Sequence, residues 1–261
     1  MSTPITQSTP VPFLSIEGVD GAGKSSHLAT IQRLLVGLGH EVVMTREPGG
    51  TPVGERLREL ALSTEMDPMT EVMLMMASRH QHERSVIVPA LSQGRTVVSD
   101  RFKDSTFAFQ GAGRELSQDV LRQLDALTSG VKPLTTILFD IDPAIARQRM
   151  SAKDLDRFES MGADFHVRVR NAYRALAEED PDRFIVIDSS KTLPQVQEQV
   201  ERAVESFHMR CLAFQEQFPS YPIREYAPWA AMPGLSSDEA PVAPASPSPS
   251  TLDRDHAASL S

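Results

Sequence analysis

Cysteine is almost absent from this chain of 261 residues, which contains only Cys211. One cysteine cannot form an intramolecular disulfide, so nothing in the composition calls for an oxidising compartment. No stretch approaches the roughly 20 apolar residues that a membrane-spanning helix needs. Residues 1–12 also have neither the basic start nor the apolar run of a signal peptide. The sequence therefore predicts a soluble, cytoplasmic protein with no membrane partner.

Positive charge is also scarce, with 26 Lys and Arg against 35 Asp and Glu and a formal net charge of −9. This balance argues against a surface that binds nucleic acid non-specifically. The seven histidines form no metal-ligand pattern. His80 and His82, two apart on an expected helix, do not share a face of that helix.

Composition divides the chain into four parts. Residues 1–12 are expected to be a flexible leader, and the Pro/Ala/Ser-rich residues 235–261 a disordered tail. An arm at 209–234 contains four prolines within "FPSYPIREYAPWAAMP", with two of the three tyrosines and the only tryptophan. It either packs on its own domain or contacts a partner. The remaining 13–208 form the expected folded domain.

Within 13–208 short apolar runs alternate with helix-like segments, which predicts a parallel sheet covered by helices on both faces. The expected strands are 13–17, 41–45, 96–100, 135–141 and 184–188. The expected helices are 24–37, 68–92, 117–129, 143–150, 163–178 and 192–207. Ligands of such sheets bind at the carboxyl ends of the strands.

The stretch from Gly18 to Ser25 matches G-x-x-x-x-G-K-[ST] in full, between a predicted strand and a predicted helix. Glycines let backbone N–H groups turn inward, and the helix N-terminus adds partial positive charge. In such turns the lysine, here Lys24, reaches the β- and γ-phosphates, and the hydroxyl of Ser25 is a Mg²⁺ ligand. The turn therefore predicts a nucleoside triphosphate site.

Three classes of protein use such a turn. A GTPase should carry an N-K-x-D motif, which the chain lacks, and "SAKD" at 151–154 does not follow a strand. A remodelling ATPase usually has a longer chain and a second nucleotide-sensing domain. A small-molecule kinase needs a compact fold, an acceptor pocket and mobile positive charge, and the sequence offers all three.

Four further segments carry acceptor features: "TREPGGT" (45–51), "ASRHQH" (77–82), "SDRFKDSTFAFQG" (99–111) and "RQRMSAKDLDRFE" (147–159). In the third segment an Asp-Arg pair ends a strand close to the phosphate turn. Asp100 can hold the Mg²⁺ shell, and Arg101 can bind a second phosphate with its two-pronged guanidinium.

In this order and spacing, the phosphate turn, "TREPGG", "DRF…S…QG" and "LDRFE" closely resemble thymidylate kinase of the bacterial type, over about 13–208. The resemblance implies a P-loop nucleoside monophosphate kinase fold with a five-stranded parallel sheet. It also implies ATP with Mg²⁺ as donor, dTMP as acceptor, dTDP as product and a homodimer.

Several roles follow from the resemblance by position. Asp20 matches the acid that seats the acceptor near the donor, and Arg79 the arginine that hydrogen-bonds the thymine edge. Arg101 matches the arginine on the acceptor phosphate. Ser105 and Thr106 match the polar pair that faces the base.

In this bacterial type the catalytic positive charge comes from the lid, here 149–157, which agrees with the lack of arginine in 19–22. The resemblance assigns catalysis to Asp20, Lys24, Arg101, Arg149, Lys153 and Arg157. It assigns ATP binding to Gly18, Val19, Asp20, Gly21, Ala22, Gly23, Lys24, Ser25 and Ser26, and metal binding to Ser25 and Asp100. It assigns acceptor binding to Glu47, Pro48, Met75, Arg79, Arg101, Ser105, Thr106 and Phe109.

Three positions depart from the family pattern. Met75 stands where an aromatic ring usually stacks on the base, and Phe109 replaces a tyrosine. Ala152-Lys153 stands where an arginine-glycine step is usual. Two alternatives to a dTMP kinase therefore remain: a kinase for dUMP or a 5-modified dUMP, and a nucleotide-binding relative without turnover. The intact Lys24 speaks against the second, as do Ser25, Asp100 and Arg101.

Overall fold

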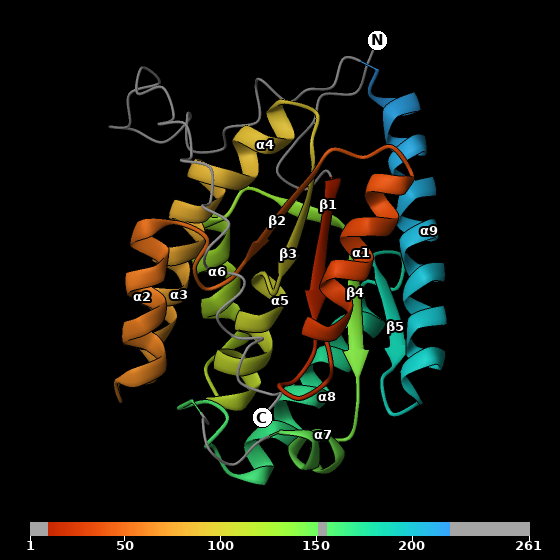
Figure 1. Ribbon diagram of the computed structural model, residues 1–261. Coiled ribbons are helices and arrows are strands. Elements are labelled where there is room, and N and C mark those ends of the chain that lie inside the picture. Colours follow the sequence, from red (N-terminus) through yellow and green to blue (C-terminus); the bar gives the residue numbers. More distant parts are fainter. Residues whose placement is uncertain (1–9, 151–155, 220–261) are drawn as a thin grey trace, which may run out of the picture.

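The computed structural model describes residues 10–150 and 156–219, which form one five-stranded sheet flanked by helices (Figure 1). The strands are β1 (Pro10–Glu17), β2 (Val42–Arg46), β3 (Thr96–Asp100), β4 (Lys132–Asp140) and β5 (Phe184–Asp188). Their order is β2-β3-β1-β4-β5, and every pairing is parallel. This confirms the expected five-stranded parallel sheet, although β1 begins within the segment expected to be a flexible leader.

The helices lie on both faces of the sheet. They are α1 (Ser25–Gly37), α2 (Pro52–Ser63), α3 (Pro68–His82), α4 (Val88–Ser92), α5 (Lys103–Thr106), α6 (Gln118–Thr128), α7 (Pro143–Arg149), α8 (Ala163–Glu179) and α9 (Leu193–Gln217). Two π-helical turns, η1 (Glu83–Ile87) and η2 (Phe107–Gly113), continue α3 and α5. Figure 1 shows α1 and α9 on one side of the sheet and α2, α3 and α6 on the other. None of the helices in the described ranges is long and apolar enough to cross a membrane.

Burial on both faces explains why the three central strands, β1, β3 and β4, are mostly apolar rather than alternating. Successive residues of a strand point to opposite faces. Val97 and Val98 of β3 are both fully buried, yet they belong to different apolar clusters. The larger cluster includes Ile137 and Phe139 of β4, and the smaller includes Phe13 of β1.

The helices depart from the sequence prediction in three places. One is the segment formed by α5 and η2, which the sequence did not predict as helical. Helix α2 was not predicted, although Thr51 caps it by accepting from Gly54 N at 2.9 Å and Pro52 occupies its first turn. These are known helix-start signals, which the preceding Pro-Gly-Gly loop obscured. Helix α9 also continues to Gln217, beyond the expected domain end at 208, so the first part of the expected arm is helical. Residues 220–234 of that arm lie outside the described residues.

The strand register brings the sequence motifs to one edge of the sheet. Asp100, at the end of β3, is level with Ile16 of β1 and with Arg46 of β2. The phosphate turn, the loop after β2 and the Asp100–Arg101 pair therefore begin side by side. Parallel strands bind ligands at this carboxyl edge.

Candidate active site

The phosphate turn lies between β1 and α1 and has the backbone that its glycines predict. Gly18 has φ 140°, and a Cβ there would lie 2.5 Å from the Phe139 carbonyl oxygen, so only glycine fits. Lys24 is buried, and its Nζ donates to the carbonyl oxygens of Gly18 and Val19, both at 3.0 Å. Burial, and then the charge of Arg101, lowers the pKa of Lys24 to about 8. Asp20 and Asp100 favour the charged form, but no ion pair joins Lys24 to a carboxylate within the described residues, and a phosphate would provide such a partner.

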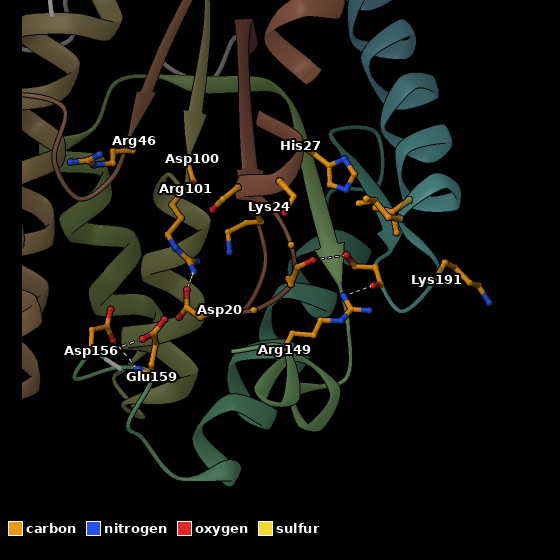
Figure 2. A pocket seen from close by; sticks show the side chains of 18 of the residues that line it. Asp20, Lys24, His27, Arg46, Asp100, Arg101, Arg149, Asp156, Glu159 and Lys191 are labelled. Atoms are coloured by element: carbon orange, nitrogen blue, oxygen red, sulfur yellow. Dashed lines mark hydrogen bonds and ion pairs between the residues drawn. The ribbon is translucent and has the colours of Figure 1, made fainter. Parts of the chain in front are cut away.

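A cavity of about 740 Å³ opens over this turn, within the size range of small-molecule sites. Basic side chains from the turn, the ends of β2 and β3, helices α2 and α7 and the loop after β5 line it (Figure 2). They are Lys24, Arg46, Arg58, Arg101, Arg149 and Lys191. So many cations around a turn of inward N–H groups suit a polyanion such as a triphosphate.

The three expected lid residues have different positions. Arg149 lines the cavity and donates from Nη1 to the Ser189 carbonyl oxygen at 2.9 Å. Arg157 does not line it, because its Nη2 pairs with Glu71 at 2.7 Å and its Nε donates to the Ala61 carbonyl oxygen at 3.0 Å. The structure therefore does not bring Arg157 to the phosphate turn. Lys153 lies outside the described residues.

Asp100 provides a test of the expected metal site. Its Oδ1 atom is buried and has no hydrogen-bond partner within the described part of the chain. Asp100 and Ser25 line the same cavity. Among the described residues no group of three His, Cys, Asp or Glu side chains could hold a metal. This sparse oxygen set fits Mg²⁺, which usually takes one or two protein ligands together with phosphates and water.

Arg101 has an unusual backbone that aims its side chain into the site. Its φ is 68°, in the left-handed region that non-glycine residues rarely adopt. Its backbone N donates to Ile16 O at 2.9 Å, and its Nη1 to Gly18 O at 2.9 Å. Its Nη2 forms an ion pair with Asp20. Burial alone would lower the pKa of Arg101, but Asp20 raises it, so the guanidinium stays charged.

Glu17 stabilises the segment that follows Arg101, a role that the sequence analysis missed. The buried carboxylate accepts from Phe102 N at 2.7 Å, from Ser105 Oγ at 2.6 Å and from Tyr173 Oη at 2.8 Å. Burial and the charge of Asp104 raise the pKa of Glu17 to about 7. The sequence did contain a signal for this role: Glu17 is a charged residue at the end of an apolar strand. A carboxylate buried there needs hydrogen-bond partners.

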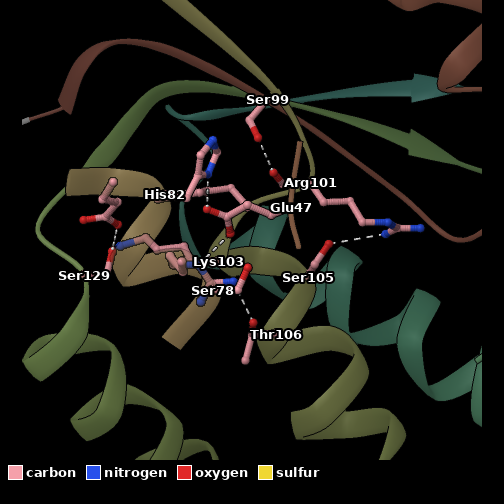
Figure 3. Close-up of polar contacts among 12 residues, drawn as sticks. Glu47, Ser78, His82, Ser99, Arg101, Lys103, Ser105, Thr106 and Ser129 are labelled. Atoms are coloured by element: carbon pink, nitrogen blue, oxygen red, sulfur yellow. Dashed lines mark hydrogen bonds and ion pairs between the residues drawn. The ribbon is translucent and has the colours of Figure 1, made fainter. Parts of the chain in front are cut away.

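A second pocket adjoins the first and shares with it Asp20, Glu47, Arg58, Arg101 and Asp156. All the expected acceptor residues line it: Glu47, Pro48, Met75, Arg79, Arg101, Ser105, Thr106 and Phe109. The side chains of Arg79 and Glu47 are almost completely buried, and Arg79 Nε donates to Glu47 Oε2 at 2.8 Å. Arg79 Nη2 donates to Thr106 Oγ1 at 2.8 Å. Figure 3 shows Glu47 and Thr106 of this pocket, and the contact between Arg101 and Ser105.

Arg58 was missed because it lies on α2, a helix that the sequence analysis did not predict. Its Nη1 donates to the Pro48 carbonyl oxygen at 3.0 Å, and its side chain lines both pockets. Burial, and then Arg46, lowers the pKa of Arg58. A second arginine beside Arg101 at the junction of the pockets increases the positive charge where a phosphoryl group would move.

A phosphate turn at the carboxyl edge of this five-stranded parallel sheet, with a buried acceptor pocket beside it, defines a P-loop phosphotransferase of the nucleotide kinase class. The family model described as thymidylate kinase matches residues 16–200. The chain therefore belongs to the thymidylate kinase family.

Individual relatives agree with this assignment. The thymidylate kinase of Paraburkholderia xenovorans (strain LB400) is 48% identical over 198 residues, covering 74% of this chain and 96% of the relative. That of Burkholderia lata is 46% identical over the same length. A crystal structure of thymidylate kinase from Ehrlichia chaffeensis aligns with a TM-score of 0.61 and 28% identity, over 76% of this chain and 99% of that chain.

Proposed function

We propose that this enzyme transfers the terminal phosphoryl group of ATP to dTMP, giving ADP and dTDP. The observation that carries the proposal is the junction of the two pockets at Asp20 and Arg101. There a triphosphate on the turn and a monophosphate in the second pocket would meet. The family membership and the names of the relatives favour dTMP over the alternatives of dUMP and of binding without turnover.

The chemistry requires alignment and charge neutralisation. The acceptor phosphate has a second pKa of about 6, so no general base is needed at neutral pH. Lys24 would bind the β- and γ-phosphates, and Arg101, oriented by Asp20, would bind the acceptor phosphate. Arg149 lines the donor cavity and supplies further positive charge. Lys153 keeps the catalytic role expected for it as a prediction.

Mg²⁺ is the proposed cofactor, with Ser25 and Asp100 as the residues that would hold it. Bound there, the ion would neutralise charge on the transferred phosphoryl group. The unpartnered Oδ1 of Asp100 supports this site because a buried carboxylate oxygen without a donor is costly unless a cation meets it.

We also propose a homodimer that works in the cytoplasm. Helices α2 and α3 pack together and expose three large apolar side chains, Val53 (51% exposed), Leu60 (43%) and Met73 (50%), which a second copy could cover. The single cysteine, Cys211, is buried and unpaired, which suits a reducing compartment. Equilibrium sedimentation of the chain, with Met73→Glu as the test variant, distinguishes a dimer from a monomer.

A coupled assay of ADP release, run with dTMP, dUMP, dCMP and dGMP as acceptors, tests the function. We expect dTMP to have the highest kcat/KM. Uracil lacks only the 5-methyl group of thymine, and one carbon contributes roughly 10- to 200-fold discrimination. Weak turnover of dUMP is therefore expected, and dUMP equal to or better than dTMP would contradict the assignment.

A further inference from the structure

His82, the last residue of α3, lies behind the acceptor pocket without lining either pocket. Its side chain is fully buried. Nδ1 lies 2.9 Å from Glu47 Oε1 (Figure 3), and Nε2 lies 2.5 Å from Thr45 Oγ1. The ring therefore bridges α3 to the end of β2 and the loop that follows it.

The partners determine which tautomer a neutral ring adopts. A carboxylate only accepts hydrogen bonds, so Nδ1 carries the proton that is donated to Glu47. In the neutral ring Nε2 then has a lone pair, which accepts from the hydroxyl of Thr45. Both nitrogens of the buried ring are thereby satisfied, and its orientation is determined. A Cβ at Gly50 would lie 2.7 Å from the ring, so the backbone of the loop packs closely against His82.

The other oxygen of Glu47 holds Arg79. Glu47 Oε2 accepts from Arg79 Nε at 2.8 Å, while Arg79 Nη2 donates to Thr106 Oγ1 at 2.8 Å. These bonds leave N–H groups of the guanidinium for a ligand, because a guanidinium has five donors in a planar arrangement. Burial would raise the pKa of Glu47, but Arg79 and His82 lower it, so the carboxylate stays ionised.

We propose that His82 is a positioning residue for the acceptor base: it holds the carboxylate of Glu47 in place, and Glu47 in turn orients Arg79. The proposal rests on the proposed function, in which Arg79 meets the edge of the thymine ring. Without the bond from His82, one oxygen of Glu47 loses its donor and the carboxylate can rotate. Arg79 then presents its free N–H groups in more than one direction.

The consequence is a loss of base discrimination. Thymine presents a carbonyl acceptor where cytosine presents an amino donor. A well-oriented guanidinium can donate to thymine but meets a second donor in cytosine, so it favours thymine. A mobile guanidinium distinguishes the two bases poorly. A side chain that only stabilised the fold would change turnover of both bases alike. Acceptor selectivity thus separates a positioning role from a structural one.

Two variants of His82 separate its two nitrogens. In His82→Asn the amide N–H can replace Nδ1–H toward Glu47. In His82→Gln the amide lies closer to the former Nε2 and faces Thr45. We expect His82→Gln to raise the KM for dTMP by about tenfold or more. Tenfold corresponds to the lower end of the effect expected for losing a hydrogen bond to a charged group. The KM for ATP should stay unchanged, and the kcat/KM ratio of dTMP over dCMP should fall about tenfold. His82→Asn should stay within about threefold of wild type.

The matched control is His40→Gln. His40 is a partly buried histidine that is likewise bonded at both nitrogens, to Thr96 and His208, and lines neither pocket. Its kinetics should match wild type. Melting temperatures of all variants identify any general loss of stability.

Affinities for dTMP and dCMP measured by calorimetry complete the test, because they do not require turnover. A wild type that binds dTMP without phosphorylating it would contradict the proposed function alone. Unchanged dTMP affinity and unchanged selectivity in His82→Gln would overturn the His82 proposal. So would equal losses in His82→Asn and His82→Gln, since the proposal requires rescue by the variant that keeps the donor to Glu47.

Discussion

Arg157 pairs with Glu71, with Nη2 and Oε2 2.7 Å apart, and the side chain of Glu71 is fully buried. The same carboxylate accepts from Gln110 Nε2 at 2.9 Å and from Arg114 Nη2 at 2.9 Å. Glu71 of α3 therefore joins η2 to the segment that follows α7. Phe158, next to Arg157, lines the acceptor pocket beside Phe109, with ring centroids 6.0 Å apart. Arg157 thus holds one wall of the acceptor pocket in place.

We predict that Arg157→Ala acts through this contact. The variant should lower the free energy of unfolding by about 2 kcal/mol, which is typical for the loss of a hydrogen bond between charged groups. The loss should not be larger, because Glu71 still accepts from Gln110 and Arg114. The KM for dTMP should rise because Phe158 loses its support. Urea unfolding and steady-state kinetics measure the two effects. A large fall in kcat with unchanged stability and unchanged KM would instead indicate that Arg157 neutralises charge on the transferred phosphoryl group.

Arg114→Gln is the matched control for this variant. It removes another arginine from the same carboxylate, but Arg114 does not line the acceptor pocket. A comparable loss of stability with an unchanged KM for dTMP would show that the effect on KM is specific to Arg157.

Lys24 should contribute to catalysis while lowering the stability of the ligand-free protein. Its pKa is about 8 in the folded state and 10.5 in the reference state, so the unfolded chain binds this proton more tightly. The cost of burying the charge is fully present below pH 8 and disappears as the pH rises toward 10.5. Lys24→Met should therefore lack this pH dependence, so its free energy of unfolding relative to that of wild type should fall by roughly 3 kcal/mol between pH 8 and pH 10.5.

Urea unfolding of both proteins at several pH values measures this difference. Turnover should fall below about a tenth of the wild-type kcat, a barrier increase of at least 1.4 kcal/mol. A stability difference between the two proteins that stays constant from pH 8 to pH 10.5 would show that the buried lysine carries no such cost.

Most residues of the candidate site could be predicted from local sequence motifs. The residues and contacts that were not predicted depend on tertiary contacts between distant segments. The phosphate turn and the Asp100–Arg101 pair follow strands directly, so their spacing alone placed them at the carboxyl edge. Contacts between distant segments left no such pattern. Arg157 lies 86 positions from Glu71, and no local rule links them.

Arg58 and His82 were missed for different reasons. Arg58 lies on α2, and the sequence analysis assigned no element to residues 52–63. His82 falls within the predicted acceptor segment 77–82, but no local pattern indicates which residues it contacts. Its actual partners, at the end of β2 and in the following loop, are known only once α3 is packed against them.

Met75 should limit the affinity for the acceptor base. It lines the acceptor pocket and is almost completely buried, but a thioether orients a base less strictly than an aromatic ring does. Base–aromatic stacking contributes about 1–3 kcal/mol, so Met75→Phe should lower the KM for dTMP about fivefold or more. Steady-state kinetics at saturating ATP measure the change. A raised KM for dTMP together with improved turnover of another pyrimidine would show that Met75 serves a different acceptor.

Asp100 should govern the dependence on Mg²⁺. In Asp100→Asn the charge that would meet the ion is lost, so the Mg²⁺ concentration for half-maximal kcat should rise about tenfold or more, as for removal of a charged partner. The ligand-free variant should lose little stability, because Oδ1 has no hydrogen-bond partner to lose within the described residues and only the favourable charge interaction with Lys24 and Arg101 is removed. Magnesium titrations of kcat, with urea unfolding in EDTA, measure both quantities. An unchanged magnesium requirement would remove Asp100 from the metal site, and a marked loss of stability would indicate that its carboxylate has a structural role instead.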